Sequence, residues 1–331
     1  MFLDSSGETL YYIRRVDGHD SLFAHQPDHP RGDYHAMLQS SPGRLMAWRT
    51  QQCVVSCDGW PRVQGHSLAF RFLSQTRLRD ALRRQPRAVN EQLTGVPTLG
   101  EFSLEARQLP PQIYELLAGE VLHVAGFAPA QDGAMVPALY VLDGRAAAYF
   151  AAPLPFLEST TIPSAAVTEP SGKRHWLTVG ESNHLFVLNE KYELASDVLW
   201  PAEEQGLARV AFVPHRNEAW VSAHSSVFVF DTNSHKLVGE ISAEPGLRWH
   251  RGERVRGFVG AVGFNGAATR AYLARPLSGD VLELEVASRK QTGTFPMTVD
   301  PLELACAHGK GRVYVQGLRS GAISWFACHD I

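Results

Sequence analysis

A unit of four short apolar strands, repeated about every 40 residues, constrains the fold of this 331-residue chain more than any other feature. In its clearest copy, residues 208–242, stretches that are wholly apolar or alternate in polarity are separated by turn residues. The strands of this copy are predicted at residues 210–213, 218–222, 227–230 and 236–241. Such stretches are typical of strands packed between stacked sheets, so the repeat predicts an all-β fold built from similar sheets.

Three further segments follow the same order of strands and turns. They are residues 164–200, 260–295 and 302–329, and the last of them stops after its third strand. Residues 139–144 and 145–153 match the third and fourth strands of another copy. Four strands in about 40 residues is the length of one β-propeller blade. We therefore expect residues 1–331 to form a single β-propeller domain, with seven four-stranded blades preferred to six.

The N-terminal part is expected to supply the remaining blades, although the sequence does not fix the register of its strands. Strands are predicted at residues 9–16, 21–26, 35–39, 44–49, 53–56 and 67–73. Because the last repeat lacks a fourth strand, we expect residues 1–3 to complete it. Closure of the ring by the N-terminus would remove an exposed sheet edge.

The stretch from residue 227 to residue 241 is the most diagnostic part of the repeat. It consists of a hydrophobic run, Asp231, the turn Thr-Asn-Ser-His and a second apolar run. On these residues the sequence resembles the YVTN and WD-repeat superfamily of β-propellers, well over residues 160–331 and loosely over residues 1–73. The resemblance implies the propeller fold and no particular activity. It is incomplete, since no repeat carries a Trp-Asp dipeptide.

An acidic residue ends the third strand of several repeats, where a short polar side chain usually caps the following turn. It is present as Asp143, Asp231 and Asp330, and it is replaced by Asn189 and Glu285. Asparagine can cap such a turn as aspartate does, whereas we expect glutamate to fit that role poorly.

Residues 74–97 interrupt the strand pattern. Leu78 and Leu82 lie four residues apart, Ser74 or Thr76 can cap a helix, and Pro86 disfavours its continuation, so the sequence predicts a short helical insertion between blades. Its arginines include Arg77, Arg79, Arg83 and Arg84. This basic run has two interpretations: a docking helix for an acidic partner or a phosphate backbone, or simply a solvated helix face.

A second basic stretch lies in the long connection between two well-defined repeats. It contains Arg248, Trp249, His250, Arg251 and Arg254. In a propeller, such a connection from a fourth strand to the next first strand lies on the same face as the second-to-third-strand loops. Those loops contribute His184, His224, Arg275 and Arg319. We expect all these residues around one mouth of the central channel, where arginines suit carboxylate or phosphate and a tryptophan can anchor an interface. The alternative is that long loops are merely polar in an arginine-rich chain.

Four histidines near the N-terminus are weak candidates for metal ligands. They are His19, His25, His29 and His35, and three aspartates lie among them. Their spacing matches no zinc signature, so a solvated loop is expected, and neither a metal nor another cofactor is predicted. The four cysteines are interpreted as structural free thiols.

Composition and charge exclude several classes of protein. The hydrophobic fraction of 44% and the lack of low-complexity tracts exclude a disordered chain. The net charge of −3 is spread evenly, which argues against a nucleic acid or an anionic membrane as the partner. No apolar run is long enough to span a bilayer. If Met1 is the native start, the lack of a signal peptide predicts a cytoplasmic protein.

No catalytic signature is present, since the chain lacks GxSxG, HExxH, P-loop and GxGxxG motifs in their required contexts. The sequence therefore favours a non-enzymatic interaction module that binds a protein through the loop-rich face and the arginine-rich insertion. The alternative is an enzyme, or a metal- or cofactor-carrying propeller, with its site at the channel mouth. The oligomeric state is not predicted.

Overall fold

The structure is a computed structural model in which part of the chain is described. The described residues are 2–3, 10–16, 19–25, 34–37, 44–48, 53–57, 63–67, 113–116, 121–129, 133–143, 148–158, 161, 163–179, 182–201, 208–243, 247–250, 253–307, 311–317 and 322–328. Within these ranges every regular element is a strand, and no helix is long and apolar enough to cross a membrane. The predicted helical insertion at residues 74–97 lies outside the described residues.

The described strands form antiparallel sheets in which chain neighbours pair in order. Sheet 1 contains β1 (Phe2–Leu3), β2 (Leu10–Val16), β3 (His19–His25) and β4 (Tyr34–Met37). Sheet 2 contains β5 (Arg44–Trp48), β6 (Cys53–Cys57) and β7 (Val63–Ser67). Sheet 3 contains β8 (Ile113–Leu116), β9 (Val121–Pro129), β10 (Met135–Asp143) and β11 (Ala148–Pro153). Sheet 4 contains β12 (Pro163–Thr168), β13 (Arg174–Val179), β14 (His184–Asn189) and β15 (Leu194–Leu199).

The C-terminal half continues the series. Sheet 5 contains β16 (Arg209–Phe212), β17 (Glu218–Ala223), β18 (Ser226–Asp231) and β19 (Leu237–Ser242). A separate two-stranded ribbon, β20 (Leu247–His250) with β21 (Glu253–Arg256), follows it. Sheet 6 contains β22 (Val262–Phe264), β23 (Arg270–Arg275), β24 (Asp280–Glu285) and β25 (Lys290–Pro296). Sheet 7 contains β26 (Pro301–Ala307), β27 (Arg312–Gly317) and β28 (Ile323–Ala327).

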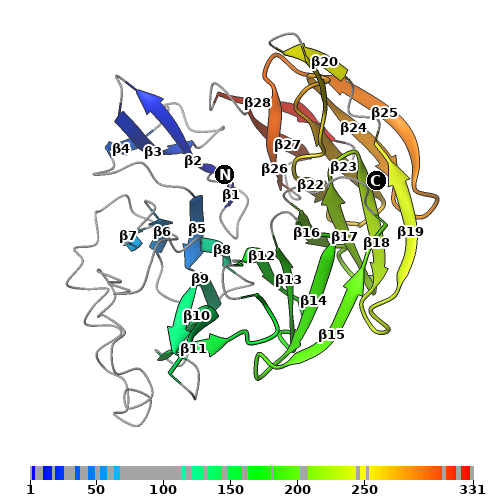
Figure 1. The fold of residues 1–331 in the computed structure, drawn as a ribbon. Coiled ribbons are helices and arrows are strands. Elements are labelled where there is room, and N and C mark those ends of the chain that lie inside the picture. The colour runs from blue at the N-terminus through cyan, green and yellow to red at the C-terminus, as the bar shows by residue number, and fades with distance from the viewer. Residues whose placement is uncertain are drawn as a thin grey trace.

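The sheets are arranged in a ring with their first strands innermost (Figure 1). Around the centre, β1 lies beside β5, β5 beside β8, β8 beside β12, β12 beside β16, β16 beside β22, β22 beside β26, and β26 beside β1. This is the all-β propeller that the repeat predicts, and its strands in residues 208–242 lie within one residue of the predicted ones. The total number of blades and the single-domain organisation stay predictions, because residues 68–112 are not described.

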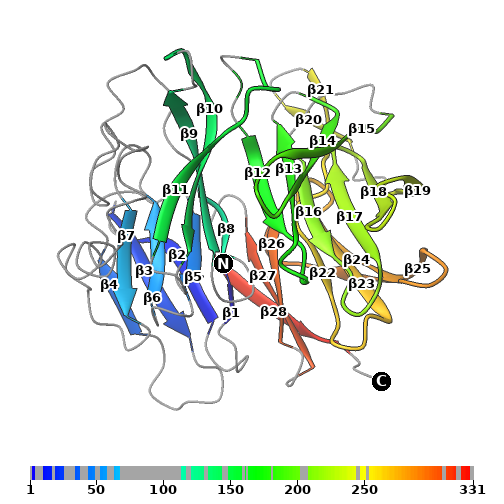
Figure 2. The ribbon, with the colours of Figure 1, turned by 90° about the horizontal axis from the view of Figure 1, so that it is seen from below.

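The N-terminus takes a different place from the one predicted. Residues 1–3 were expected to add a fourth strand to the last repeat, but β1 pairs with β2 in sheet 1. In sheet 7 it lies beside the innermost strand β26. Figure 2 shows the N-terminus in the middle of the view, between the blue N-terminal strands and the red strands of sheet 7. The expected closure is therefore wrong, because the N-terminal strand is used to begin its own sheet. Of the predicted strand at residues 67–73, only Ser67 is described, as the last residue of β7, and the rest lies outside the described residues.

One buried ring recurs at the third residue of the second strand in the sheets. Where that side chain is described, it is His123, Trp176, Trp220, Tyr272 or Tyr314, each with none of its surface exposed, or Tyr12, which is 5% exposed. We call these residues the wedge residues. The second strand lies in the middle of its sheet, so a large ring at this register position must pack against the face of a neighbouring sheet.

The wedge residues of sheets 3 to 7 each pack against the next sheet around the ring. Trp176 of sheet 4 makes edge-to-face contacts with Phe212 and Phe230 of sheet 5, at centroid distances of 5.6 and 6.2 Å. Trp220 of sheet 5 meets Phe264 of sheet 6 at 5.2 Å in the same geometry. Such edge-to-face aromatic pairs stabilise a fold beyond the burial of their area.

The same direction of packing continues to the end of the chain and across the closure. Tyr272 of sheet 6 contacts Phe326 of sheet 7 at a centroid distance of 5.6 Å. Tyr314 of sheet 7 clusters with Leu10 and Tyr12 of sheet 1. The hydrophobic core is therefore a series of joints between sheets, and the wedge residues are its repeating part.

The turns after the third strands follow the expected capping. Asp231 Oδ1 accepts hydrogen bonds from the backbone N–H of Asn233 at 3.1 Å and of Ser234 at 2.7 Å. Together with the Ser234 hydroxyl, these bonds hold the pKa of Asp231 below its usual value, the Ser234 N–H being the largest cause. Asn189 Oδ1 caps its turn in the same way. The side chain of Glu285 instead accepts a bond from the Ser288 hydroxyl, as expected for a longer residue.

Replacing a wedge residue by alanine should loosen the joint that it fills. Trp176→Ala is expected to lower the free energy of unfolding by about 3–5 kcal/mol, because it leaves a large cavity between sheets 4 and 5. The matched control is Leu194→Ala, at an exposed position of sheet 4, which should change it by less than about 1 kcal/mol. Urea unfolding monitored by circular dichroism measures both. Equal decreases in the free energy of unfolding for the two variants would contradict the claim that Trp176 stabilises the contact between sheets 4 and 5.

Candidate binding face

The structure describes some of the predicted binding residues and not others. Arg251, Arg319 and the insertion arginines Arg77, Arg79, Arg83 and Arg84 lie outside the described residues. For Arg248, Trp249, His250 and Arg254 the backbone is described. His184, His224 and Arg275 are described with their side chains.

Second-to-third-strand turns and the connections that follow the fourth strands meet on one face of the ring. In three consecutive sheets, the residue that follows the fourth strand donates its N–H to a carbonyl of the second-to-third-strand turn. These bonds run from Trp200 to Asn183, from Ala243 to Ser225 and from Met297 to Gly279, at 3.1, 2.9 and 2.9 Å. We call this end of the sheets the connection face.

The long connection between sheets 5 and 6 contains a two-stranded ribbon, β20–β21, that sequence reasoning treated as a loop. Its register pairs Trp249 with Arg254 and His250 with Glu253. The predicted basic and aromatic residues are therefore brought together by backbone pairing between two short strands. The alternation of Leu247, Trp249, Val255 and charged residues is the sequence signal that could have revealed it.

Two other predicted residues hold the base of this ribbon. The carbonyl of His224 accepts the N–H of Val259, where the connection returns to sheet 6, at 2.6 Å. Arg275 Nη1 donates to the carbonyl of Ala243, where the connection leaves sheet 5, at 2.8 Å. His224 and Arg275 thus lie at the foot of the ribbon that carries Arg248, Trp249, His250 and Arg254.

The guanidinium of Arg275 is engaged on both sides. Its Nε and Nη2 donate to the two carboxylate oxygens of Asp280 at 2.7 and 2.6 Å, while its Nη1 binds Ala243. The Arg275 side chain is only 13% exposed. A bidentate pair of this kind fixes the geometry of both partners. Arg275 therefore joins sheet 6 to the end of sheet 5 instead of presenting its fork to solvent.

His224 occupies a strained turn. It and Ser225 are the two residues between the paired ends of β17 and β18, and its φ is +49°. Glycine is the residue usually preferred at a positive φ in so short a hairpin turn. Strained backbone conformations of this type are common at functional sites. Here the turn directs the carbonyl of His224 toward the N–H of Val259.

His184 lies at the same end of the neighbouring sheet 4. Its Nδ1 is 2.8 Å from Asp197 Oδ1, and its ring stacks on Phe186 with centroids 5.4 Å apart. Both the His184 and the Asp197 side chains are partly exposed. His184 is therefore a surface group on the connection face, separate from the foot of the ribbon.

An ion pair that sequence reasoning missed crosses part of the inner ring. Arg209 Nη1 of β16 lies 2.6 Å from Glu303 Oε1 of β26, although the innermost strand β22 lies between these strands in the ring. Both side chains are about one quarter exposed, at 27% and 24%. In the sequence, Arg209 and Glu303 appear only as charged residues in the first strands of two repeats. That pattern does not show that the two residues pair with each other.

Two of the four weak metal candidates lie far apart along one strand. His19 and His25 are the first and last residues of β3, so they lie about 20 Å apart at the usual rise of a strand. His35 pairs with Phe23 on the neighbouring strand, and His29 is not described. Among the residues that the structure describes, no group of three or more His, Cys, Asp and Glu could hold a metal ion. Cys306 and Cys328 are free thiols.

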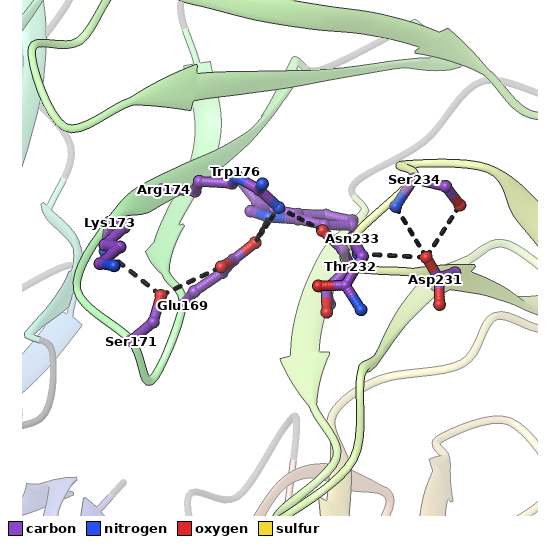
Figure 3. A network of polar contacts seen from close by, with 9 residues as sticks. All are labelled: Glu169, Ser171, Lys173, Arg174, Trp176, Asp231, Thr232, Asn233 and Ser234. Atoms are coloured by element: carbon purple, nitrogen blue, oxygen red, sulfur yellow. Dashed lines mark hydrogen bonds and ion pairs between the residues drawn. The ribbon is translucent and has the colours of Figure 1, made fainter.

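The opposite face carries a polar network that reinforces the joint between sheets 4 and 5 (Figure 3). Trp176 Nε1 donates to Glu169 Oε1 at 2.8 Å. Arg174 Nη1 lies 3.8 Å from the same carboxylate and donates to the carbonyl of Thr232 in sheet 5 at 2.5 Å. The indole N–H of this wedge residue is therefore satisfied, and the arginine ties its sheet to the next turn.

A second polar cluster is buried between sheets 3 and 4. The wedge residue His123 has its Nε2 3.0 Å from the Tyr192 hydroxyl, and its ring meets His175 with centroids 5.2 Å apart. His175 stacks on Tyr192 at 4.1 Å, and its Nδ1 is 2.6 Å from Thr168 Oγ1. Buried titratable groups often mark functional sites, but both histidines are almost fully covered. We therefore assign this cluster to the joint.

Burial sets the protonation of this pair. It lowers the pKa of His175 to about 4. It also holds the pKa of His123 well below its usual value, with a smaller effect from the nearby His175. Both rings are therefore neutral in the folded protein at pH 7.

The free energy of unfolding should fall as the pH decreases from about 6.5 to about 4, because the unfolded chain then binds protons that the folded pair does not. At about 1.36 kcal/mol per pKa unit, the shift of His175 alone accounts for about 3 kcal/mol. The double variant His123→Phe/His175→Phe should lose correspondingly less stability over this range in urea titrations at several pH values. His215→Asn, at an exposed turn, is the control and should keep the wild-type slope. Parallel pH profiles for the wild type and the double variant would contradict this assignment.

The comparisons with known proteins concern the fold. No protein-family model and no curated protein sequence matches the chain. The β-propeller domain of Cps50 (Swd1) from Myceliophteria thermophila superposes with a TM-score of 0.65 at 13% sequence identity, covering 99% of this chain and 95% of that one. A chain of the mitotic checkpoint complex superposes with a TM-score of 0.65 at 10% identity, covering 99% and 86%. At the level of fold, the protein is a β-propeller.

Proposed function

We propose that the protein is a non-enzymatic interaction module that binds an acidic surface of a protein partner through the connection face. The β20–β21 ribbon is the main contact in this proposal. The observation that carries it is the attachment of the ribbon, whose two ends are held to sheets 5 and 6 by His224 and Arg275. Binding residues are commonly found on loops that a rigid scaffold positions.

The chemistry of the ribbon supports an acidic protein partner. Residues 247–256 contain four arginines and one glutamate, a local charge of +3 in a chain whose net charge is −3. Arginine and tryptophan are enriched among the residues that dominate protein interfaces, and the register pairs Trp249 with Arg254. The arginine-rich insertion would add to the same attraction for an acidic partner. One superposed propeller comes from the structure of a multi-protein assembly, the mitotic checkpoint complex, which agrees with such a role.

A charge-reversal experiment tests the proposal. Arg248→Glu/Arg254→Glu should reduce the recovery of the specific partner at least tenfold in a quantitative pull-down from the source organism, because it removes two attractive charges and adds two repulsive ones. The matched control is Arg216→Glu/Lys236→Glu, which makes the same change in charge at exposed turns on the opposite face. This control should retain the partner.

Two results would contradict the proposed function. One is equal recovery of the partner by the ribbon variant and the control. The other is the absence of any protein that is specifically enriched by the wild type. Circular dichroism of both variants establishes that the comparison is made between folded proteins.

A further inference from the structure

Sheet 7 ends in an outer strand that has no described neighbour. Sheets 1, 3, 4, 5 and 6 each have four described strands, whereas sheet 2 has the order β5-β6-β7 and sheet 7 the order β26-β27-β28. Figure 1 shows β28 on the outer side of its sheet, farther from the centre of the ring than β26. Among the described strands, none pairs with the outer side of β28. The backbone donors and acceptors on this side of β28 therefore have no partner among the described strands.

The hydrogen bonds at the ends of the β27–β28 pair show which groups face outward. Gly317 donates to the carbonyl of Ala322, and Cys328 donates to the carbonyl of Gly311, so these two pairs are hydrogen-bonded ones. In an antiparallel ladder such pairs alternate with pairs whose groups point away. The register therefore directs the N–H and C=O groups of Ile323, Trp325 and Ala327 toward the open edge.

This edge also differs in composition from the outer strands of the three sheets that precede it along the chain. The outer strands of sheets 4, 5 and 6 contain a charged residue, namely Asp197, Glu240 and Lys290. The sequence of β28, Ile-Ser-Trp-Phe-Ala, has no charged residue and no proline. Charges and prolines on edge strands normally prevent pairing with another chain. β28 is therefore open to strand addition.

An exposed aromatic residue marks the middle of the open strand. Trp325 is 52% exposed, and the guanidinium carbon of Arg312 lies 4.8 Å from the centre of its ring. The arginine holds the indole by a cation–π contact while one side of the ring remains in solvent. An exposed tryptophan beside unpaired backbone groups is typical of an interface.

We propose that β28 is a dimerisation edge, on which β28 of a second copy of this chain adds in the antiparallel direction. The outward groups are placed symmetrically about Trp325, with Ile323 two residues before it and Ala327 two residues after it. In a two-fold arrangement centred on Trp325, each Trp325 pairs with its equivalent and each Ile323 pairs with Ala327 of the second copy. Three pairs that each exchange two hydrogen bonds then satisfy every outward group of both edges.

The second copy is the occupant that fits these features best. Neither edge carries a charge that the other would repel. The two Trp325 side chains would lie on the same face as cross-strand neighbours, so both lose exposed apolar surface. The result is a continuous sheet of six strands across the two sheets 7. This interface is at the rim and is independent of the connection face.

Sedimentation equilibrium of the full chain over about 1 to 300 µM tests the proposal. We expect a reversible shift in mass from 36.5 kDa toward twice that value. Ala327→Pro should keep the protein monomeric, because proline removes an outward N–H without affecting the bonds to β27. Ala327→Ser, which retains that N–H, should dimerise as the wild type does.

Two further measurements locate the interface. Trp325→Lys introduces a charge on the edge strand and should also give a monomer, whereas Trp325→Phe should still dimerise. If Ala327→Pro does not fold, these two variants test whether β28 forms the dimer interface. In hydrogen exchange, the amides of Ile323, Trp325 and Ala327 should become slower with increasing protein concentration, while those of Ser324 and Phe326 should not change.

Any of three results would overturn the proposal. The wild type could remain a monomer at 300 µM, including the case in which its outward amides are already protected by a strand from elsewhere. The Trp325→Lys variant could dimerise with the same affinity as the wild type. The concentration-dependent protection could also fall on a segment other than β28.

Discussion

The packing of a buried ring from each of sheets 3 to 7 against the next sheet is the interaction on which the rest of this structure depends. The rings at the third residue of the second strands are buried and all point along the same direction of the ring, from sheet 3 through sheet 7 to sheet 1. Flat sheets of three or four strands cannot bury both faces alone, so each needs its neighbours. The connection face and the open rim of sheet 7 are both held in place by these joints.

The chemistry of the wedge residue varies, and the surroundings vary with it. The indoles of Trp176 and Trp220 donate to Glu169 and Glu218, which lie near the turns of the opposite face. The joint between sheets 3 and 4 instead uses His123 with His175 and Tyr192. That joint depends on neutral imidazoles, so its contribution to stability falls as the pH decreases from about 6.5 to about 4.

Features that depend on residues close together in the sequence could be predicted, whereas contacts between segments far apart in the sequence could not. The strands of residues 208–242 and the caps at Asp231 and Asn189 follow from alternation and turn chemistry within a few residues. The wedge position could have been found from the ring that recurs after the first-to-second-strand turn in sheets 1 and 3 to 7. The pairing of β1 with β2, the engagement of Arg275 by Asp280 and Ala243, and the Arg209–Glu303 pair depend on how segments meet in space. For that reason the sequence located the connection face but not the roles of its residues.

A double-mutant cycle across one joint tests the central role of the wedge residues most directly. Trp220 and Phe264 face each other between sheets 5 and 6, and both are buried. The free energies of unfolding of Trp220→Ala, Phe264→Ala and the double variant should show a coupling of about 1 kcal/mol, since neither ring keeps its packing without the other. Additivity to within about 0.3 kcal/mol would mean that the two sheets do not depend on this contact, which would contradict the role assigned to the wedge residues.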